Sequence, residues 1–258
     1  MSAAVPETAP EAPEIAPEIA VVVPVKNEAE NIVPLIEEIH AALEGKAEFE
    51  VVYVDDGSDD ATPQVLAQAR RRFPRLKVVR HRASCGQSQA IATGVKHARA
   101  PLIAMLDGDG QNDPADLPAM MDRWRSEPPA TRDKLLIAGW RANRRDTASR
   151  RWASRMANAI RASMLNDDTP DTGCGSKLFG RALFLDLPRF DHMHRFLPAL
   201  VIRAGGKVVS VKVNHRPRGA GASKYSNLRR ALVGVPDLLG VWWLMRRSKN
   251  PAVEIPGE

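Results

Sequence analysis

The sequence predicts an α/β fold with a doubly wound, mostly parallel sheet and helices on both faces. Four short apolar runs, at residues 19–25, 49–54, 76–79 and 102–106, have the length and continuous apolar character of buried strands. Segments with apolar residues at helical spacing separate these runs. Because alternating strands and helices place parallel strands side by side, this half of the chain indicates a Rossmann-like sheet.

Each connecting segment carries its own helix signals. After the first strand, apolar side chains recur at positions 32, 35, 36, 39 and 43, and Gly45 then ends the pattern. Residues 61–72 and 86–99 are predicted to form the next two helices. Every crossover between the four strands is therefore expected to be helical.

The second half of the chain is expected to extend the sheet. Residues 115–125 and 190–203 are predicted helices, and residues 134–138 and 207–213 are predicted strands. The arginine-rich stretch 141–165 is expected to begin as a loop and to continue as a helix.

Composition indicates one globular domain with a tail at each end. With 258 residues and 44% apolar residues, the chain can bury a substantial core, which we assign to residues 19–226. Residues 1–18 are rich in Ala, Pro and Glu and do not resemble a signal peptide, so we expect a disordered tail and a cytoplasmic protein. Cys85 and Cys174 form no disulfide or zinc framework, which favours a reducing compartment.

Charge is distributed unevenly along the chain. The formal net charge is +6, acidic residues cluster early, and residues 141–161 contain seven arginines against the single acid Asp146. Residues 192–236 contain no Asp or Glu. This polarity indicates an anionic partner at one face. Nucleic acid is the rival partner, but aromatic residues make up only 5% of the chain and no stacking platform is evident.

An acidic turn follows the fourth predicted strand. Asp107, Asp109 and Gln111 alternate with glycines, which permit a tight turn and the close approach of a ligand. Oxygen-bearing side chains of this kind suit Mg²⁺ or Mn²⁺. The alternative is a plain Asp-Gly turn, capped by Asp113 ahead of a helix that begins at Pro114.

Two other strand ends carry polar residues that suit a nucleotide. The first strand leads into Pro24, Lys26 and Glu28, and the second leads into Asp55 and Asp56. Ligands of parallel sheets bind beyond the carboxyl ends of the strands, so these ends and the acidic turn predict a nucleotide-diphosphate site. The chain contains neither a G-x-G-x-x-G motif after the first strand nor a P-loop, which argues against dinucleotide and P-loop binding.

Two later segments suit the binding of an anion. Residues 171–181 contain glycines that allow the backbone to approach a ligand, although a plain turn is the alternative. Residues 214–226 form a basic, glycine-containing loop that could close on a phosphate. Residues 228–247 are too short and too broken by Pro236 to span a bilayer, but their flanking arginines and Trp pair suit an anionic membrane interface. Packing on the core or on a dimer partner is the alternative for this segment.

Together these motifs make the chain resemble the family-2 glycosyltransferases of GT-A fold, specifically the dolichyl-phosphate mannose synthase type that acts on polyprenyl phosphates. The resemblance covers residues 19–225 and is carried by Val-Pro-Val-Lys-Asn-Glu28, Val-Asp-Asp-Gly-Ser58, Gly86-Gln87, Asp107-Gly-Asp-Gly-Gln-Asn-Asp-Pro114 and Arg218-Gly-Ala-Gly-Ala-Ser-Lys-Tyr225. It implies a GT-A catalytic domain over residues 19–226, ahead of an amphipathic segment at 227–258. It also implies an enzyme peripheral to the inner face of the cytoplasmic membrane, as in the shorter members of the family.

The resemblance implies roles for individual residues. The metal, Mg²⁺ or Mn²⁺, is expected on Asp107, Asp109 and Gln111, and we expect catalysis to depend on Asp107, Asp109 and Arg218. The nucleotide sugar, GDP-mannose or a UDP-sugar, is expected to contact Pro24, Lys26, Glu28, Asp55, Asp56, Gln87 and Asp107. The acceptor phosphate is expected near Arg151, Arg161, Cys174, Ser176, Lys177, Arg216, Arg218, Ser223 and Lys224.

The chain departs from the family pattern at the predicted acceptor site. Cys174-Gly-Ser-Lys177 stands where the family usually has Ser-Gly-Phe-Arg or Ser-Gly-Phe-Lys, so Ser176, Lys177 or a backbone N–H has to supply the contact expected from that serine. The Q-x-x-R-W motif of processive synthases is absent, which favours a single transfer. One alternative acceptor is a glycan or glycolipid hydroxyl with Asp171 as general base. A non-enzymatic nucleic-acid-binding module is the alternative from another class.

Overall fold

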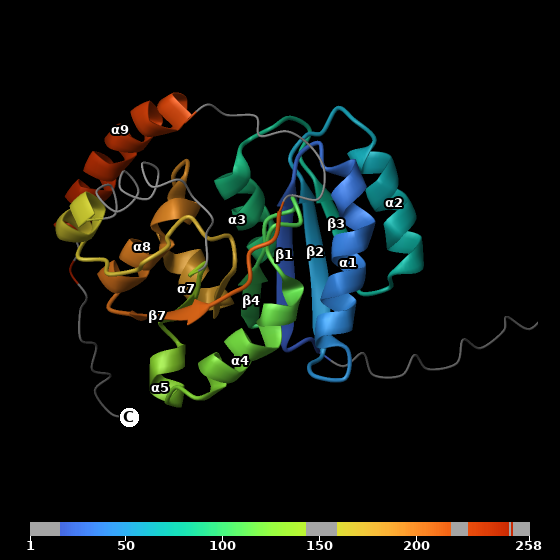
Figure 1. The fold of residues 1–258 in the computed structure, drawn as a ribbon, viewed down its shortest axis with the longest axis horizontal. Coiled ribbons are helices and arrows are strands. Elements are labelled where there is room, and N and C mark those ends of the chain that lie inside the picture. Colours follow the sequence, from blue (N-terminus) through green and yellow to red (C-terminus); the bar gives the residue numbers. More distant parts are fainter. Residues whose placement is uncertain (1–15, 143–158, 218–226, 248, 250–258) are drawn as a thin grey trace, which may run out of the picture.

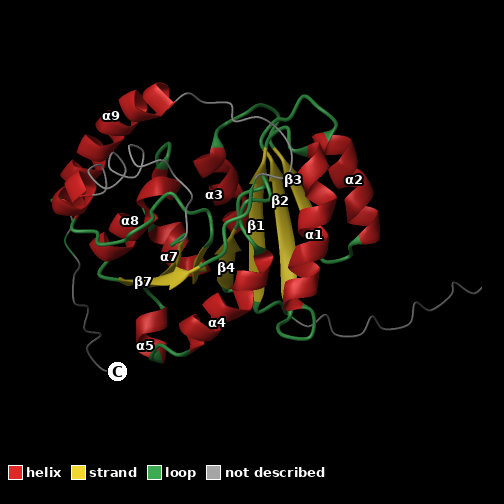
Figure 2. Cartoon of the chain, in the orientation of Figure 1, coloured by secondary structure: helices red, strands yellow, loops and turns green. Residues whose placement is uncertain are grey.

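The computed structural model describes residues 16–142, 159–217, 227–247 and 249. Within these residues the chain forms one seven-stranded sheet with helices on both faces (Figures 1 and 2). Of the tail predicted at residues 1–18, residues 1–15 lie outside the described residues, while the backbone N–H of Glu18 donates to Glu48 O at 2.7 Å. The strands are β1 Ile19–Val25, β2 Phe49–Asp55, β3 Leu76–Arg80, β4 Leu102–Met105, β5 Leu135–Trp140, β6 Lys177–Gly180 and β7 Lys207–Lys212.

The sheet is mostly parallel, as predicted. Its strand order is β3-β2-β1-β4-β6-β5-β7, and the first four strands are mutually parallel. Strand β6 runs antiparallel to both β4 and β5, while β5 and β7 are parallel. Val25 pairs with Asp55, which pairs with Arg80, so these carboxyl ends are level. Leu106 N donates to Val22 O at 3.2 Å, which brings the acidic turn to the same edge.

Two apolar cores lie on opposite faces of the sheet. Helices α1, α2 and α4 cover one face, and α3, α7, α8 and α9 cover the other (Figure 1). The apolar spacing predicted for α1 is correct, because its apolar positions are buried against the sheet. The helices are α1 Ala29–Leu43, α2 Thr62–Arg72, α3 Gln87–His97, α4 Leu117–Arg125, α5 Pro129–Arg132, α7 Arg181–Asp186, α8 Leu197–Arg203 and α9 Asn227–Met245, with 3₁₀ turns at Pro114–Asp116 and Met193–Phe196.

Two of the predicted elements need correction. The single helix predicted at residues 190–203 is a 3₁₀ turn followed by α8, because His192 adopts a left-handed φ of 64° that an α-helix cannot contain. The glycine-containing segment 171–181 holds more regular structure than its composition indicates. It contains β6, which inserts between β4 and β5 and leads directly into α7.

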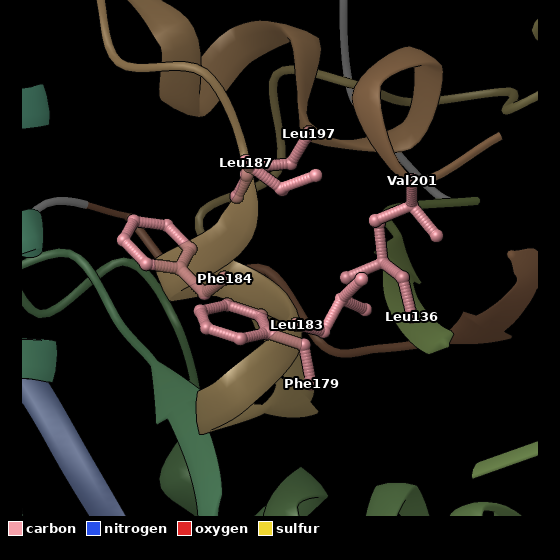
Figure 3. Close-up of a pocket in the computed structure, with 7 residues that line it drawn as sticks. All are labelled: Leu136, Phe179, Leu183, Phe184, Leu187, Leu197 and Val201. Carbon is pink, nitrogen blue, oxygen red and sulfur yellow. The ribbon is translucent and has the colours of Figure 1, made fainter. Parts of the chain in front are cut away.

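An apolar gap on the α7 and α8 side of the sheet is core packing and not a substrate site. Figure 3 shows its seven lining side chains, all of them apolar, and the space between them does not admit a water molecule. No polar group is available there to orient a ligand. The lining residues are Leu136, Phe179, Leu183, Phe184, Leu187, Leu197 and Val201.

Helix α9 packs over the second core through one face only. Val241 is buried, and Leu238 and Trp242 are partly buried against that core. Val235, Leu239 and Trp243, spaced four residues apart, are 58%, 53% and 56% exposed. Among the described residues, no helix has both the length and the apolar character to cross a membrane.

Candidate active site

The acidic turn is held by hydrogen bonds from its own chain. Gln87 Nε2, at the start of α3, donates to Asp107 Oδ1 at 2.8 Å, and the backbone N–H of Asp107 donates to Asn112 Oδ1 at 2.9 Å. The backbone N–H of Gln111 donates to Asp109 Oδ1 at 3.1 Å. Asp107, Asp109 and Gln111 remain half-buried, so the turn is rigid and still accessible.

Electrostatics at the turn favour the arrival of a cation. Burial raises the pKa of Asp107, and the neighbouring Asp109 carboxylate raises it further, while the Lys177 ammonium acts in the opposite direction. Two carboxylates that repel each other in this way gain from a divalent cation between them. The donor set of two carboxylates and an amide also consists of oxygen ligands, which Mg²⁺ and Mn²⁺ prefer. The residues therefore fit such a metal.

Gly175 allows the backbone to reach Asp107, and Gly108 allows the acidic turn to pack against the end of β1. A Cβ atom at Gly175 would lie 2.1 Å from Asp107 Oδ2 and 2.6 Å from Asn112 Oδ1. A Cβ atom at Gly108 would lie 2.4 Å from Val25 Cγ1. The segment 171–176 thus lies directly against the acidic turn, and only glycine fits at the contact.

Lys177 fixes the shape of that segment from within the protein. Its side chain is almost fully buried, and its ammonium donates to the carbonyl oxygens of Cys174 and, at 3.3 Å, of Thr172. Burial lowers the pKa of Lys177, although Cys174 and Asp107 act to raise it. The predicted contact between Lys177 and the acceptor phosphate requires these bonds to break. As the structure stands, Lys177 supports the loop, and its contact with a phosphate stays a prediction.

The other described residues of the predicted acceptor group are also buried or paired. Arg161 donates to Asp167 Oδ2 at 2.9 Å and to Thr169 O at 2.8 Å, and burial lowers its pKa. Cys174 and Ser176 are each 1% exposed, and Ser176 Oγ has no hydrogen-bond partner among the described residues. These three side chains belong to the walls of the site as it stands, and their contact with a phosphate stays a prediction.

Asp171, the alternative general base, forms a bidentate ion pair. Arg141 Nε donates to Asp171 Oδ2 at 2.7 Å, and Arg141 Nη2 donates to Asp171 Oδ1 at 2.8 Å. The pair closes the segment 171–176 onto the end of β5. A carboxylate engaged on both oxygens is poorly placed to accept a further proton from a substrate hydroxyl.

The predicted nucleotide side contains two aspartates with different surroundings. Asp55 is fully buried, accepts from Ser58 N at 2.9 Å and lies 3.0 Å from Arg80 Nε. Burial acts to raise the pKa of Asp56, but hydrogen bonds from the segment that precedes α3 and from His81 hold it below its usual value. Both carboxylates thus hold together the loops that follow β2 and precede α3, which we call the rim of the site. A direct contact of either carboxylate with the nucleotide stays a prediction.

The first strand end and α3 frame the remainder of this side. Pro24 is buried, Lys26 is exposed, and Glu28 Oε2 accepts from Asn31 Nδ2 at 2.7 Å. The backbone N–H of Glu28 also donates to Thr62 Oγ1 at 3.0 Å, which ties the segment between β1 and α1 to the start of α2. Gln87 is brought to Asp107, so the structure connects two residues that the sequence analysis assigned to the same ligand.

The basic loop begins beside the acidic turn. His215 forms a β-bridge with Asn112, and the backbone N–H of Arg216 donates to Gln111 O at 3.1 Å. The Arg216 guanidinium pairs with Glu38 at 2.7 and 3.0 Å, so this arginine anchors the loop. Arg218, Ser223 and Lys224 follow but lie outside the described residues, as does Arg151.

Sequence reasoning missed Asn112 and His215. Asn112 is buried and accepts from the backbone of Asp107, while His215 is brought to the turn by β7, about a hundred residues along the chain. A signal for Asn112 was its place within the motif that contains Asp107. No local signal for His215 exists, because its position depends on the pairing of β7 with β5.

A sheet with this strand order, an acidic turn at its carboxyl edge and a basic loop bridged to that turn together define a glycosyltransferase of GT-A fold. The family model for glycosyl transferase family 2 matches residues 20–187, and the chain belongs to that family.

Solved structures agree on the fold. A mannosyltransferase from Pyrobaculum calidifontis, in complex with GDP-Man and Mn²⁺, aligns with a TM-score of 0.63 at 20% identity and covers 96% of this chain and 69% of its own. Glucosyl-3-phosphoglycerate synthase from Mycobacterium tuberculosis, in complex with Mg²⁺ and UDP, aligns with a TM-score of 0.65 at 16% identity. The alignment covers 92% of this chain and 81% of that protein.

Two curated relatives are closer in sequence. Dodecaprenyl-phosphate galacturonate synthase of Rhizobium johnstonii is 34% identical over 240 residues, which span 90% of this chain and 68% of that protein. Undecaprenyl-phosphate 4-deoxy-4-formamido-L-arabinose transferase of Pseudomonas paraeruginosa is 32% identical over 213 residues, or 81% of this chain and 61% of that protein. The chain thus spans about two thirds of the length of these relatives.

Proposed function

We propose that the protein transfers one sugar from a nucleotide-diphosphate sugar to a polyprenyl phosphate, with Mg²⁺ or Mn²⁺ as cofactor. The single observation that carries the proposal is the acidic turn, where Asp107 and Asp109 repel each other beside a loop rich in basic residues. The names of the curated relatives, which describe transfer to dodecaprenyl and undecaprenyl phosphate, support the acceptor class.

The residues of the turn have separate tasks in this reaction. Asp107, Asp109 and Gln111 would hold the cation, and Gln87 fixes the orientation of the Asp107 carboxylate. When bound, the cation acts as a Lewis acid that stabilises the departing diphosphate. Gly175 and Lys177 keep the loop 171–176 against the turn, so the carboxylates need no rearrangement during the reaction.

The donor is proposed to lie along the first two strand ends, with GDP-mannose and UDP-sugars as the candidate donors. Pro24, Lys26, Glu28, Asp55 and Asp56 border this region, either directly or through the rim that they organise. The anomeric carbon would then face the acidic turn, because the diphosphate has to reach the cation.

The acceptor phosphate is proposed to attack that carbon. A phosphate oxygen forms the new bond, the bond from the anomeric carbon to the diphosphate breaks, and the nucleoside diphosphate leaves with inversion. A phosphate monoester is already ionised near neutral pH and needs no strong general base. The engagement of both Asp171 oxygens by Arg141 favours this acceptor over a hydroxyl. Arg218 and Lys224 are proposed to hold the phosphate.

The acceptor class is tested by two variants. Purified protein is incubated with GDP-mannose or a UDP-sugar, Mg²⁺ or Mn²⁺ and a short polyprenyl phosphate, and the glycolipid product is measured. Arg218→Ala should weaken use of the acceptor, while Arg70→Ala, on the exposed face of α2, serves as the control. Asp171→Asn should retain a substantial rate. A collapse with Asp171→Asn in a folded protein, together with an unaffected Arg218→Ala, would favour the hydroxyl acceptor.

We also propose that α9 lies on the anionic surface of the cytoplasmic membrane. The exposed side chains of Val235, Leu239 and Trp243 form one apolar stripe, and the exposed Arg246 and Arg247 follow it directly. This arrangement matches a lipid surface that is apolar inside and negatively charged at its boundary. A lipid acceptor requires the enzyme to work at such a surface.

Vesicle sedimentation tests the membrane proposal. Binding to anionic vesicles should weaken with added salt and with Trp243→Ala. Trp242→Phe is the control, because Trp242 packs on the core beneath Arg246 and should matter little for binding. Equal binding of Trp243→Ala and the unaltered protein would contradict the membrane proposal and favour a contact of the stripe with another protein surface.

A further inference from the structure

A second group of potential metal ligands lies at the same edge of the sheet, apart from the acidic turn. Asp56 follows β2, His81 follows β3 and Cys85 precedes α3. One ligand atom from each of these residues lies within 4.8 Å of the other two. A carboxylate, an imidazole and a thiolate together are ligands of zinc, whereas Mg²⁺ takes oxygen ligands. The group therefore differs in chemistry from Asp107 and its neighbours.

Two of the three ligands are already held in position. Asp56 Oδ1 lies 2.7 Å from His81 Nδ1, and the other ring nitrogen of His81 lies 2.9 Å from Thr93 Oγ1 on α3. Histidines that bind metals ordinarily form a hydrogen bond through the second nitrogen, which fixes the orientation of the ring. Thr93 already supplies this outer contact.

The third ligand combines a fixed backbone with a free side chain. The backbone N–H of Cys85 donates to Asp56 Oδ1 at 2.8 Å, and that of Gly86 donates to Asp56 Oδ2 at 2.9 Å. The Cys85 side chain is exposed, and its thiol donates to Ala83 O at 3.4 Å. A small rotation would bring the sulfur toward His81 without moving the backbone, and ions can enter from solvent on this side.

We propose that Asp56, His81 and Cys85 form a binding site for a thiophilic divalent cation such as Zn²⁺, with water in the fourth position. The ion takes the place of the proton on His81 Nδ1, which moves to Nε2 beside Thr93 Oγ1, and of the thiol proton of Cys85, which leaves to solvent. A bound ion joins the ends of β2 and β3 to the segment before α3. Gln87, at the start of α3, contacts Asp107. A bound ion would therefore also stabilise the start of α3, which lies between the two sites.

Cobalt substitution tests this site without any use of catalysis. Co²⁺ bound to a thiolate gives an intense near-ultraviolet charge-transfer band that oxygen ligands do not give. The protein is titrated with Co²⁺ in excess Mg²⁺, which occupies oxygen-only sites. We expect the band to saturate at one equivalent and to disappear on addition of Zn²⁺.

Four variants assign the ligands. Cys85→Ser should abolish the band, and His81→Gln should weaken Co²⁺ binding by about tenfold or more. Thr93→Val should weaken it by a similar factor through the orientation of the His81 ring. His97→Gln, an exposed histidine on α3, should have no effect.

Two results would overturn the proposal. One is a native protein without the band at millimolar Co²⁺. The other is a band that persists in Cys85→Ser, because the thiolate would then belong to Cys174. Urea unfolding of each variant, together with the rise in melting temperature that Zn²⁺ should produce only when Cys85 is present, separates loss of a ligand from loss of the fold.

Discussion

Asp56 and Asp107 both lie just beyond the carboxyl end of a central strand, but their surroundings have opposite effects. Burial of Asp56 acts to raise its pKa, yet four hydrogen bonds, including two from backbone N–H groups, hold the pKa below its usual value. The pKa of Asp107 is raised by burial and by Asp109. The Asp56 carboxylate is already stabilised as an anion by its own chain before any ion binds, whereas the Asp107 carboxylate has to gain that stabilisation from a bound cation.

The comparison extends to the basic groups behind each carboxylate. His81 bonds directly to Asp56. On the other side, Lys177 is buried and acts on Asp107, whereas His194 is partly buried. Desolvation together with the Lys177 charge lowers the pKa of His194 to about 3. The same edge of the sheet thus contains a rim in which the charge of Asp56 is stabilised and a turn in which the charges of Asp107 and Asp109 repel each other. Unfavourable interactions of the second kind are typical of binding sites.

The largest expected effect concerns the turn. Asp109→Asn keeps the acceptor for the Gln111 N–H but removes a metal-binding charge, so sugar transfer should fall on the order of a hundredfold or more. The melting temperature of the metal-free protein should hold or rise, because the repulsion of Asp107 is relieved. Asp122→Asn, exposed on α4, is the control. Near-normal transfer by a folded Asp109→Asn protein would remove the metal assignment.

A pair of glycine variants measures how closely the loop supports the turn. Gly175→Ala would place a methyl group 2.1 Å from Asp107 Oδ2, so we expect transfer to fall about tenfold or more. Gly173→Ala is the matched control, because its nearest neighbour, Arg141 Nη2, would lie at 3.5 Å, an ordinary contact. Equal steady-state rates for the two variants would show that the position of Asp107 does not depend on this loop.

Neutralising Asp56 at the rim should lower the stability of the protein, whereas neutralising Asp109 should not. Asp56→Asn places an amide donor against one of the N–H groups now bonded to the carboxylate, and it should lower the free energy of unfolding by about 1–3 kcal/mol. Urea denaturation measures this change. A stabilised Asp56→Asn protein would contradict the contrast drawn between Asp56 and Asp107.

The smallest effect is a dependence on pH. His194 is protonated below about pH 6.5 in the unfolded chain, but only below about pH 3 in the folded protein. Protons therefore favour the unfolded state, so the folded protein has its full stability above about pH 6.5 and loses stability as the pH falls. At pH 6 the free energy of unfolding should be lower by about 1 kcal/mol than at pH 8, and the loss should grow as the pH falls further. His194→Asn should flatten the stability profile between pH 7 and pH 5. His97→Gln, which is exposed, should leave the profile unchanged.

Local patterns were sufficient for part of this protein. Continuous apolar runs and helical spacing predicted the four parallel strands and their crossovers, because each depends on neighbouring residues alone. The position of Asp107 directly after a buried strand was sufficient to place it at the carboxyl edge of the sheet. The combination of the Asp107 motif with the other four motifs also predicted the family to which the chain belongs.

Long-range packing decided the remainder. Lys177, Arg161 and Arg216 were all predicted to bind the acceptor phosphate. In the fold they donate instead to loop carbonyls, to Asp167 and to Glu38, respectively. Likewise, Trp242 and Trp243 are neighbours in the sequence, yet only Trp243 is left exposed once α9 packs. The sequence alone does not distinguish a charged residue that binds a ligand from one that is paired within the protein, or a buried aromatic residue from an exposed one. The partner of each residue comes from another element, and only the folded chain brings the two together.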